Sequence, residues 1–99
     1  MRLLLTEPAA VDLADIIEFI AEENPKAAEK THRAIAATAR RIAEFPAIGR
    51  TGRVPQTREL PVTALPYLLV YQVNADDITI LAVFHTSRDL SRALTERLK

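Results

Sequence analysis

The chain has 99 residues, with 13 acidic and 13 basic side chains, so its formal net charge is zero. This length suits one domain over residues 1–99 and leaves no room for a second hydrophobic core. With no cysteine and only two histidines, disulfides and thiolate-bound metals are excluded, and we expect no metal site and no cofactor. No apolar run approaches the ~20 residues that span a bilayer, so we expect a cytoplasmic protein with no membrane contact.

The charges are unevenly distributed along the chain. Residues 1–24 carry six acids and one base, whereas residues 25–58 carry eight bases and two acids. Such a dipolar chain does not favour nonspecific binding of nucleic acid. Two explanations remain open: neighbouring helices whose opposite charges face each other, or a basic surface with a function.

The first half of the chain predicts a strand and two helices. Residues 2–6 suit a short strand, and residues 6–8 (Thr-Glu-Pro) are typical of a helix start. Apolar residues then recur at helical spacing, with acids on the opposing side. Asn24 before Pro25 ends this helix, because a residue that precedes proline is pushed out of the helical region. Pro25 begins a second helix that ends near Phe45, which gives an antiparallel hairpin.

The second half predicts three strands and a helix. Residues 46–55 hold both glycines and suit a loop. Arg58–Val62 is a short, proline-limited strand expected at a sheet edge. Tyr67–Val73 and Ile78–Phe84 are apolar on both faces, so we expect them to pair at the centre of the sheet. Asp89–Leu98 suits a short amphipathic helix with a capping aspartate.

The predicted order is therefore β-α-α-β-β-β-α, an α+β fold in which the N-terminal helical hairpin packs on a mostly antiparallel sheet. The hairpin can cover one face of the sheet. The other face needs the C-terminal segment or a partner, because apolar surface left exposed favours association with another chain.

Five local sequences in this order resemble the ParE/RelE toxin superfamily of type II toxin–antitoxin systems. They cover nearly the whole chain and read AAVDLADIIEFIAEENPKAAEK, IAEFPAIGR, TREL, PYLLVYQV and ITILAVFHTSRD. The resemblance implies a toxin that a co-expressed antitoxin neutralises. It also implies that the toxin contacts operator DNA only through that antitoxin.

Two activities divide this superfamily: RelE-like members cleave messenger RNA on the ribosome, and ParE-like members inhibit DNA gyrase. Leu68 stands where some of the nucleases have an arginine, and no tyrosine follows Tyr71. The ending His85–Asp89 is closer to ParE-like members. The resemblance therefore favours gyrase inhibition, with a ribosome-dependent endoribonuclease as the alternative. A third hypothesis is an inactive member that only binds its antitoxin for transcriptional autoregulation.

The nuclease alternative requires a group that takes the 2′-hydroxyl proton and cations that stabilise the phosphorane. His85 could titrate near neutrality, and Arg58 and Arg88 could hold the phosphate. Strand alternation would place His85 on the face of Leu81 and Val83, which also permits a structural or partner-contacting role.

Arg88 has a structural alternative, an ion pair with Asp89 or Glu59. His32 falls within the apolar stripe of the second predicted helix. We expect it at the edge of the core with its ring hydrogen-bonded.

Two sets of residues are candidates for binding other macromolecules. The first would bind the target through basic side chains near glycines and strand ends, although a solvated loop is the simpler interpretation of its loop members. Its members are Arg50, Arg53, Arg58 and Arg88. The second would bind the antitoxin through apolar anchors that may equally be core residues. Its members are Leu13, Ile17, Ile20, Leu90, Leu94 and Leu98.

Overall fold

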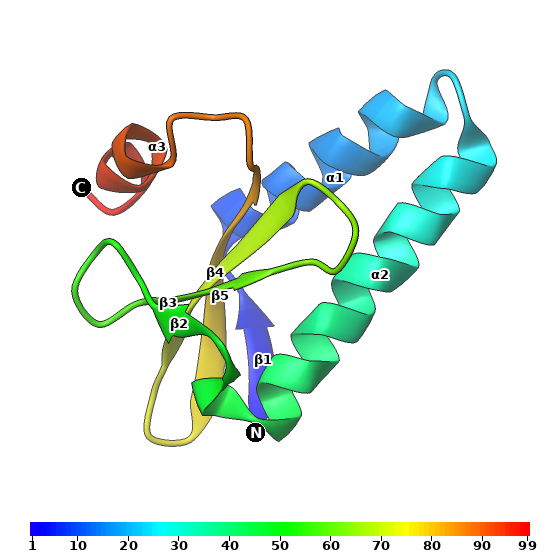
Figure 1. Ribbon diagram of the computed structural model, residues 1–99. Helices are drawn as coiled ribbons and strands as arrows, with labels where there is room; N and C mark the ends of the chain where they lie inside the picture. The colour runs from blue at the N-terminus through cyan, green and yellow to red at the C-terminus, as the bar shows by residue number, and fades with distance from the viewer.

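A five-stranded sheet lies at the centre of the molecule, with a helical hairpin on one face and a short helix on the other (Figure 1). The computed structural model describes residues 1–99. Its elements are β1 (Arg2–Leu5), α1 (Glu7–Ala21), α2 (Pro25–Glu44), the 3₁₀ helix η1 (Pro46–Ile48), β2 (Arg50–Thr51), β3 (Arg58–Pro61), β4 (Tyr67–Val73), β5 (Asp77–His85) and α3 (Leu90–Arg97). The α+β fold and the order of the long elements are confirmed. No helix is long and apolar enough to cross a bilayer.

The strand order in the sheet is β1-β5-β4-β3-β2, with β1 parallel to β5 and every other pair antiparallel. The expected edge position of Arg58–Val62 is wrong, because β2 pairs with β3 on its outer side. The region 46–55, expected as a loop, contains both η1 and β2. A strand of two residues has no alternation that a sequence pattern could reveal.

Side-chain caps set the start of each helix. The Thr6 hydroxyl accepts a hydrogen bond from the Ala9 amide (3.1 Å), and the Asn24 side chain accepts one from the Ala27 amide (3.0 Å). Each cap satisfies an amide that the first turn of a helix leaves without a partner. The first helix ends at Ala21, slightly before the proline signal, and a tight turn then leads into α2.

Hydrophobic residues form a cluster on each face of the sheet. The cluster under the helical hairpin includes Ile35 and Ile42 from α2, packed against Leu69 and Ile80. The second cluster is closed by α3, and its members are Leu68, Val70, Ala82, Phe84, Ala93 and Leu94. The expectation that β4 and β5 are apolar on both faces is confirmed, and the C-terminal segment provides the second cover.

A β-bulge interrupts the pairing of β4 with β5. Val70 pairs with Ala82, but the next residue of β4 pairs with Ile80, so Leu81 is an extra residue in β5. The bulge shifts the alternation, and Ile80 and Val83 therefore lie in the same cluster. The expected grouping of Leu81 with Val83 on the face of His85 is wrong for Leu81, which belongs to neither cluster.

The two helices of the hairpin do not pair their opposite charges. Of the six ion pairs in the structure, none joins α1 to α2. Facing charges were one of two explanations for the uneven charge distribution, and the structure contradicts it. The acids of α1 other than Asp12 form no ion pair at all.

A buried tyrosine fixes the connection between α2 and the sheet. The Tyr71 hydroxyl donates to the Pro46 carbonyl (2.7 Å) and accepts from the Gly49 amide (2.8 Å). A Cβ at position 49 would lie 2.6 Å from the Tyr71 hydroxyl oxygen. Glycine is therefore required here by close approach.

We expect Tyr71→Phe to lower the free energy of unfolding by about 2–4 kcal/mol, because two buried backbone groups would lose their partner. Urea denaturation measures this loss. Tyr67→Phe is the matched control, since the Tyr67 hydroxyl makes no hydrogen bond within the chain, and we expect a change below ~0.5 kcal/mol. Equal losses in the two variants would contradict this account of Tyr71.

Candidate functional site

The C-terminal half of β5 has a bare edge. Pairing with β1 covers β5 only as far as Ile80, whose carbonyl accepts from the Thr6 amide (3.1 Å). Beyond Ile80, backbone groups on this side of β5 form hydrogen bonds with side chains instead of with a strand. Unpaired backbone groups at a strand edge need such partners, because otherwise they can form hydrogen bonds with a strand of another chain.

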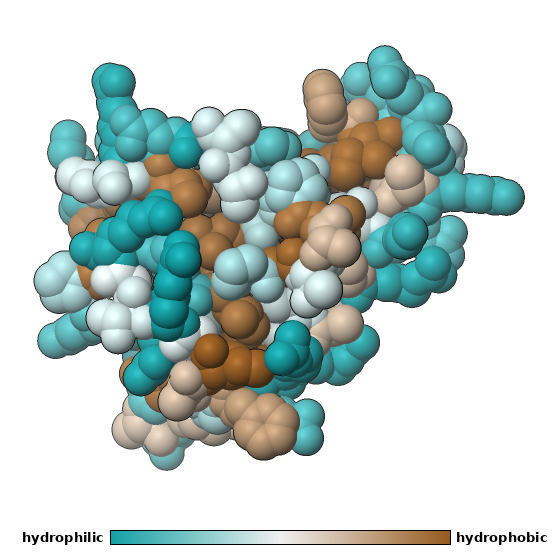
Figure 2. All heavy atoms as spheres, in the orientation of Figure 1, coloured by the Kyte–Doolittle hydropathy of each residue, from teal (hydrophilic) through white to brown (hydrophobic).

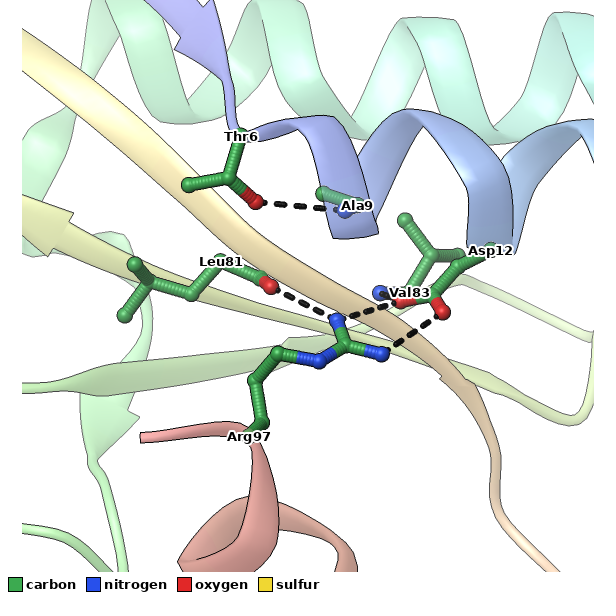
Figure 3. Close-up of polar contacts among 6 residues, drawn as sticks. All are labelled: Thr6, Ala9, Asp12, Leu81, Val83 and Arg97. Atoms are coloured by element: carbon green, nitrogen blue, oxygen red, sulfur yellow. Dashed lines mark hydrogen bonds and ion pairs between the residues drawn. The ribbon is translucent and has the colours of Figure 1, made fainter. Parts of the chain in front are cut away.

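Asp12 and Arg97 occupy this edge (Figure 3). The Asp12 carboxylate accepts from the Val83 amide (3.0 Å) and from the Arg97 guanidinium through both oxygens (2.8 and 2.9 Å). The same guanidinium donates to the Leu81 carbonyl (2.9 Å). The pair therefore joins α1, β5 and α3 at one point. The hydrogen bond to Asp12 raises the pKa of Arg97 above its ordinary value, while partial burial opposes the rise.

Two guanidinium groups lie close to the ring of Phe84, which is on the α3 side of the sheet. The guanidinium carbon of Arg88 lies 4.5 Å from the ring centroid and that of Arg97 lies 5.0 Å away. Both distances are within the range of cation–π attraction. The expected ion pair of Arg88 with Asp89 or Glu59 is wrong, because the aromatic face attracts the guanidinium instead.

Arg50 and Arg53 converge on a buried carboxylate. Glu59 is only 1% exposed, and its side chain accepts from the Arg50 guanidinium (3.1 Å) and from the Arg53 amide (2.9 Å). The Arg53 guanidinium lies 3.8 Å from the same carboxylate. A buried charge needs such partners. The two arginines thus have a structural task in addition to any contact with a target.

The three candidate nuclease residues do not converge. Arg58 donates to the carbonyls of Gly49 (2.7 Å) and Ala47 (3.4 Å), and its backbone is paired with Tyr71. His85 is on β5, the strand on the other side of β4, and pairs with Tyr67 at the opposite end of β4. Four residues along a strand separate these positions by about 13 Å.

The contacts of His85 are with neighbouring residues of the fold. Its ring stands edge-on to that of Tyr67, with centroids 5.3 Å apart, and its Nδ1 accepts from the Ser87 amide (3.0 Å). Arg88 lies on Phe84, which belongs to the cluster on the opposite face of the sheet. The chain therefore brings no cation to His85 from this predicted trio. No three histidine or carboxylate side chains lie close enough together to hold a metal ion.

An apolar groove runs between the helices and the β1 edge. Two adjoining hollows, of about 260 and 410 Å³, share Leu5, Leu13 and His32 in their linings. We call this surface the hairpin groove. Its remaining lining residues are Leu3, Ala10, Ala14, Ile17, Glu18, Ile35, Ala36, Ala39, Arg40, Leu69, Ile80 and Val83. The expected core-edge position of His32 is wrong: this residue is exposed and its ring makes no hydrogen bond within the chain.

The six apolar anchors predicted for the antitoxin are dispersed. Leu13 and Ile17 line the hairpin groove, whereas Ile20 lies beside Tyr67 in a separate hollow. On α3, Leu94 is fully buried beneath its own chain and is unavailable in this conformation, because it closes the second cluster. Leu90 packs partly against that cluster, and Leu98 is exposed.

Sequence reasoning missed Asp12, Arg97, Glu59 and Phe19. The first two are 85 residues apart, and no local pattern links them. Glu59 stands between Arg58 and Leu60 in a strand of four residues, and no apolar alternation marks it as an inward-facing acid. Phe19 stands among acids on the polar side of α1, and an apolar residue on a polar helix face is a usable sign.

Comparison with known proteins places these features in a family. Residues 3–90 match the family described as the ParE toxin of the type II toxin–antitoxin system, parDE. The chain belongs to this ParE toxin family. A similar protein is Y4kP of Sinorhizobium fredii (strain NBRC 101917 / NGR234), which is classed as a candidate toxin. It is 33% identical over 93 residues, or 94% of this chain and 96% of that protein.

A solved structure gives the same result for the fold. A chain of the chromosomal ParDE toxin–antitoxin system from P. aeruginosa is similar with a TM-score of 0.79 and 26% identity. The likeness covers 86% of this chain and 95% of that one. The resemblance to the ParE/RelE superfamily, and to its ParE-like members in particular, is thereby confirmed.

The contact between Asp12 and Arg97 yields a stability prediction for this ParE-family toxin. We expect Asp12→Ala and Arg97→Ala each to lower the free energy of unfolding by about 2 kcal/mol, because each leaves a partly buried charge and a backbone group without a partner. The double variant should lose much less than the sum of the single losses, with a coupling of about 1–3 kcal/mol. Urea denaturation of the four proteins measures the coupling.

The exposed pair Glu29–Arg33 is the control for this cycle. Its side chains are 69% and 70% exposed and their charged atoms lie 3.3 Å apart. Solvent screening should keep its coupling below ~0.5 kcal/mol. Additive losses at Asp12 and Arg97 would show that the contact does not stabilise the protein.

Proposed function

We propose that this toxin arrests growth by inhibiting DNA gyrase and that a cognate antitoxin neutralises it. The observation that carries the choice of gyrase is the separation of Arg58, His85 and Arg88. Cleavage of RNA without a metal needs a base and a cation at one phosphate. In this chain the guanidinium of Arg58 is bound to loop carbonyls and that of Arg88 lies on an aromatic ring.

The antitoxin is proposed to bind the hairpin groove. The groove is lined mainly by apolar side chains and lies beside β1, whose outer edge has no partner strand. An amphipathic segment could place apolar side chains in such a groove, and an extended segment could pair with the free edge. Leu13 and Ile17 are the predicted anchors that this proposal retains.

The proposed role as a gyrase inhibitor also implies where the toxin acts and what it contacts. The toxin acts in the cytoplasm, where gyrase works on the chromosome, and residues 1–99 act as one toxin domain. It contacts operator DNA only through the antitoxin. The side chains of Arg50 and Arg53 are partly exposed beside Glu59, so they can contact a target while remaining paired.

A supercoiling assay tests the choice of target. We expect purified toxin at micromolar concentration to inhibit negative supercoiling of a relaxed plasmid by gyrase, and its antitoxin to restore the activity. Primer extension on translated messenger RNA is run in parallel. Codon-phased cuts that disappear in His85→Ala, together with unaffected gyrase, would replace the proposal with the endoribonuclease alternative.

A substitution in the hairpin groove tests the antitoxin site. We expect Ile17→Arg to weaken antitoxin binding at least ~100-fold, because a charged side chain would be placed in an apolar contact. Isothermal titration calorimetry measures the change. Val11→Arg is the matched control on the same helix, since Val11 is exposed and lies outside the groove. Unchanged affinity in Ile17→Arg would exclude this groove as the main antitoxin contact.

A further inference from the structure

Phe19 is the most exposed large apolar side chain of the molecule. It is 75% exposed and lies in the last turn of α1. It lines a hollow of about 330 Å³ together with Ile16, Ile20, Tyr67 and His85. We call this the Phe19 surface. In Figure 2, apolar atoms also gather between α1 and α2 where the hairpin extends beyond the sheet. An exposed aromatic ring beside an apolar hollow is typical of a protein-binding surface.

The Phe19 ring itself does not contribute to the hydrophobic core. It packs in neither hydrophobic cluster, whereas the neighbouring Ile16 and Ile20 pack against the core under the hairpin. It is also separate from the hairpin groove. Residues of a helix advance by about 100° each, so Phe19 lies about 200° round α1 from Ile17. The Phe19 ring and the Ile17 side chain therefore lie on opposite sides of α1.

Acidic side chains surround the ring. Asp15 lies four residues before Phe19 and is its neighbour on α1, and Glu22 and Glu23 follow in the turn that closes the helix. All three are exposed, and none forms an ion pair within the chain. Their charges are thus available to a partner and define which partner fits.

We propose that the Phe19 surface is where this toxin binds its target, and that the target presents a basic protein surface with an apolar pocket for the ring. This inference rests on the proposed function, because it assumes that the toxin has a protein target. An enzyme that handles DNA carries lysine and arginine along the path of the DNA. The acidic rim of Phe19 is complementary to such a surface, and electrostatic complementarity guides the encounter.

The same charges argue against other occupants. Nucleic acid phosphates would be repelled by the three carboxylates. A second copy of this chain would bring two acidic rims together, and like charges across an interface oppose association. The neutral lining of the hairpin groove suits an amphipathic antitoxin segment better than this rim does.

Phe19→Ala tests the proposal, with growth arrest as a readout that does not depend on the identity of the target. We expect its expression to cause no growth arrest at an induction level at which the wild type stops growth. Antitoxin affinity should change by less than ~3-fold, which shows that the variant is folded. Phe45→Ala is the matched control, because Phe45 is also an exposed phenylalanine (58%) but lies at the far end of α2. It should arrest growth like the wild type.

A second variant tests the charges. In Glu22→Lys/Glu23→Lys, we expect the toxin concentration that halves gyrase supercoiling to rise at least ~10-fold. For the wild type, the same concentration should rise with salt, because screening weakens attraction between exposed charges. A wild type that arrests growth without inhibiting gyrase would reject the choice of target and leave the growth readout of Phe19→Ala valid.

Four outcomes would overturn the proposal. The first is full growth arrest by Phe19→Ala, and the second is a loss of antitoxin binding in that variant, which would assign the surface to the antitoxin. The third is self-association of the wild type in sedimentation experiments that Phe19→Ala abolishes, which would assign the surface to a second copy. A wild type that causes no arrest also overturns it, since no target would then be engaged.

Discussion

The contact between Asp12 and Arg97 holds the layers of this protein together. It lies where β1 ends and the rest of β5 has no neighbouring strand on that side. One carboxylate and one guanidinium satisfy the Val83 amide and the Leu81 carbonyl while binding each other. Because α3 is short and contacts the sheet through few residues, this bidentate contact and the packing of Leu94 fix its position. The bulge at Leu81 turns these two backbone groups toward the edge.

The arginines of this chain show how one residue type can serve both stability and recognition. Arg50 and Arg53 neutralise a carboxylate that would otherwise be costly to bury, and Arg58 holds the carbonyls of the η1 turn. A guanidinium has several donors in a fixed plane, so one contact with the fold leaves other donors free. Basic residues near glycines therefore do not identify a binding surface by themselves.

Much of the fold was predictable because it depends on periodic patterns. The helical spacing of α1, the proline that starts α2 and the apolar run of β4 each specify an element locally. The contacts that the sequence did not predict are formed by residues far apart in the chain. No sequence pattern predicts that Arg97 binds Asp12. No pattern predicts the bulge at Leu81 either, although it changes which residues share a face with His85.

The candidate site was less predictable than the fold for the same reason. Arg58, His85 and Arg88 all occur at or near strand ends, yet the sheet directs them to different places. Leu94 has the spacing of an exposed anchor, but α3 lies against a sheet whose strands are apolar on both faces, so the leucine is buried. Phe19 could have been found, because it interrupts the acidic side of α1, where an apolar residue contributes nothing to the core.

The uneven charge distribution acquires a physical meaning once internal pairing is excluded. Apart from Asp12, the acids of α1 form no ion pair, so these charges stabilise no contact within the fold. An exposed phenylalanine in their midst also gives no folding benefit. A domain of this size has only a small margin of stability, so such features are retained most readily where they serve binding. With the hairpin groove on the other side of α1, one helix can then present two chemically different surfaces to two partners.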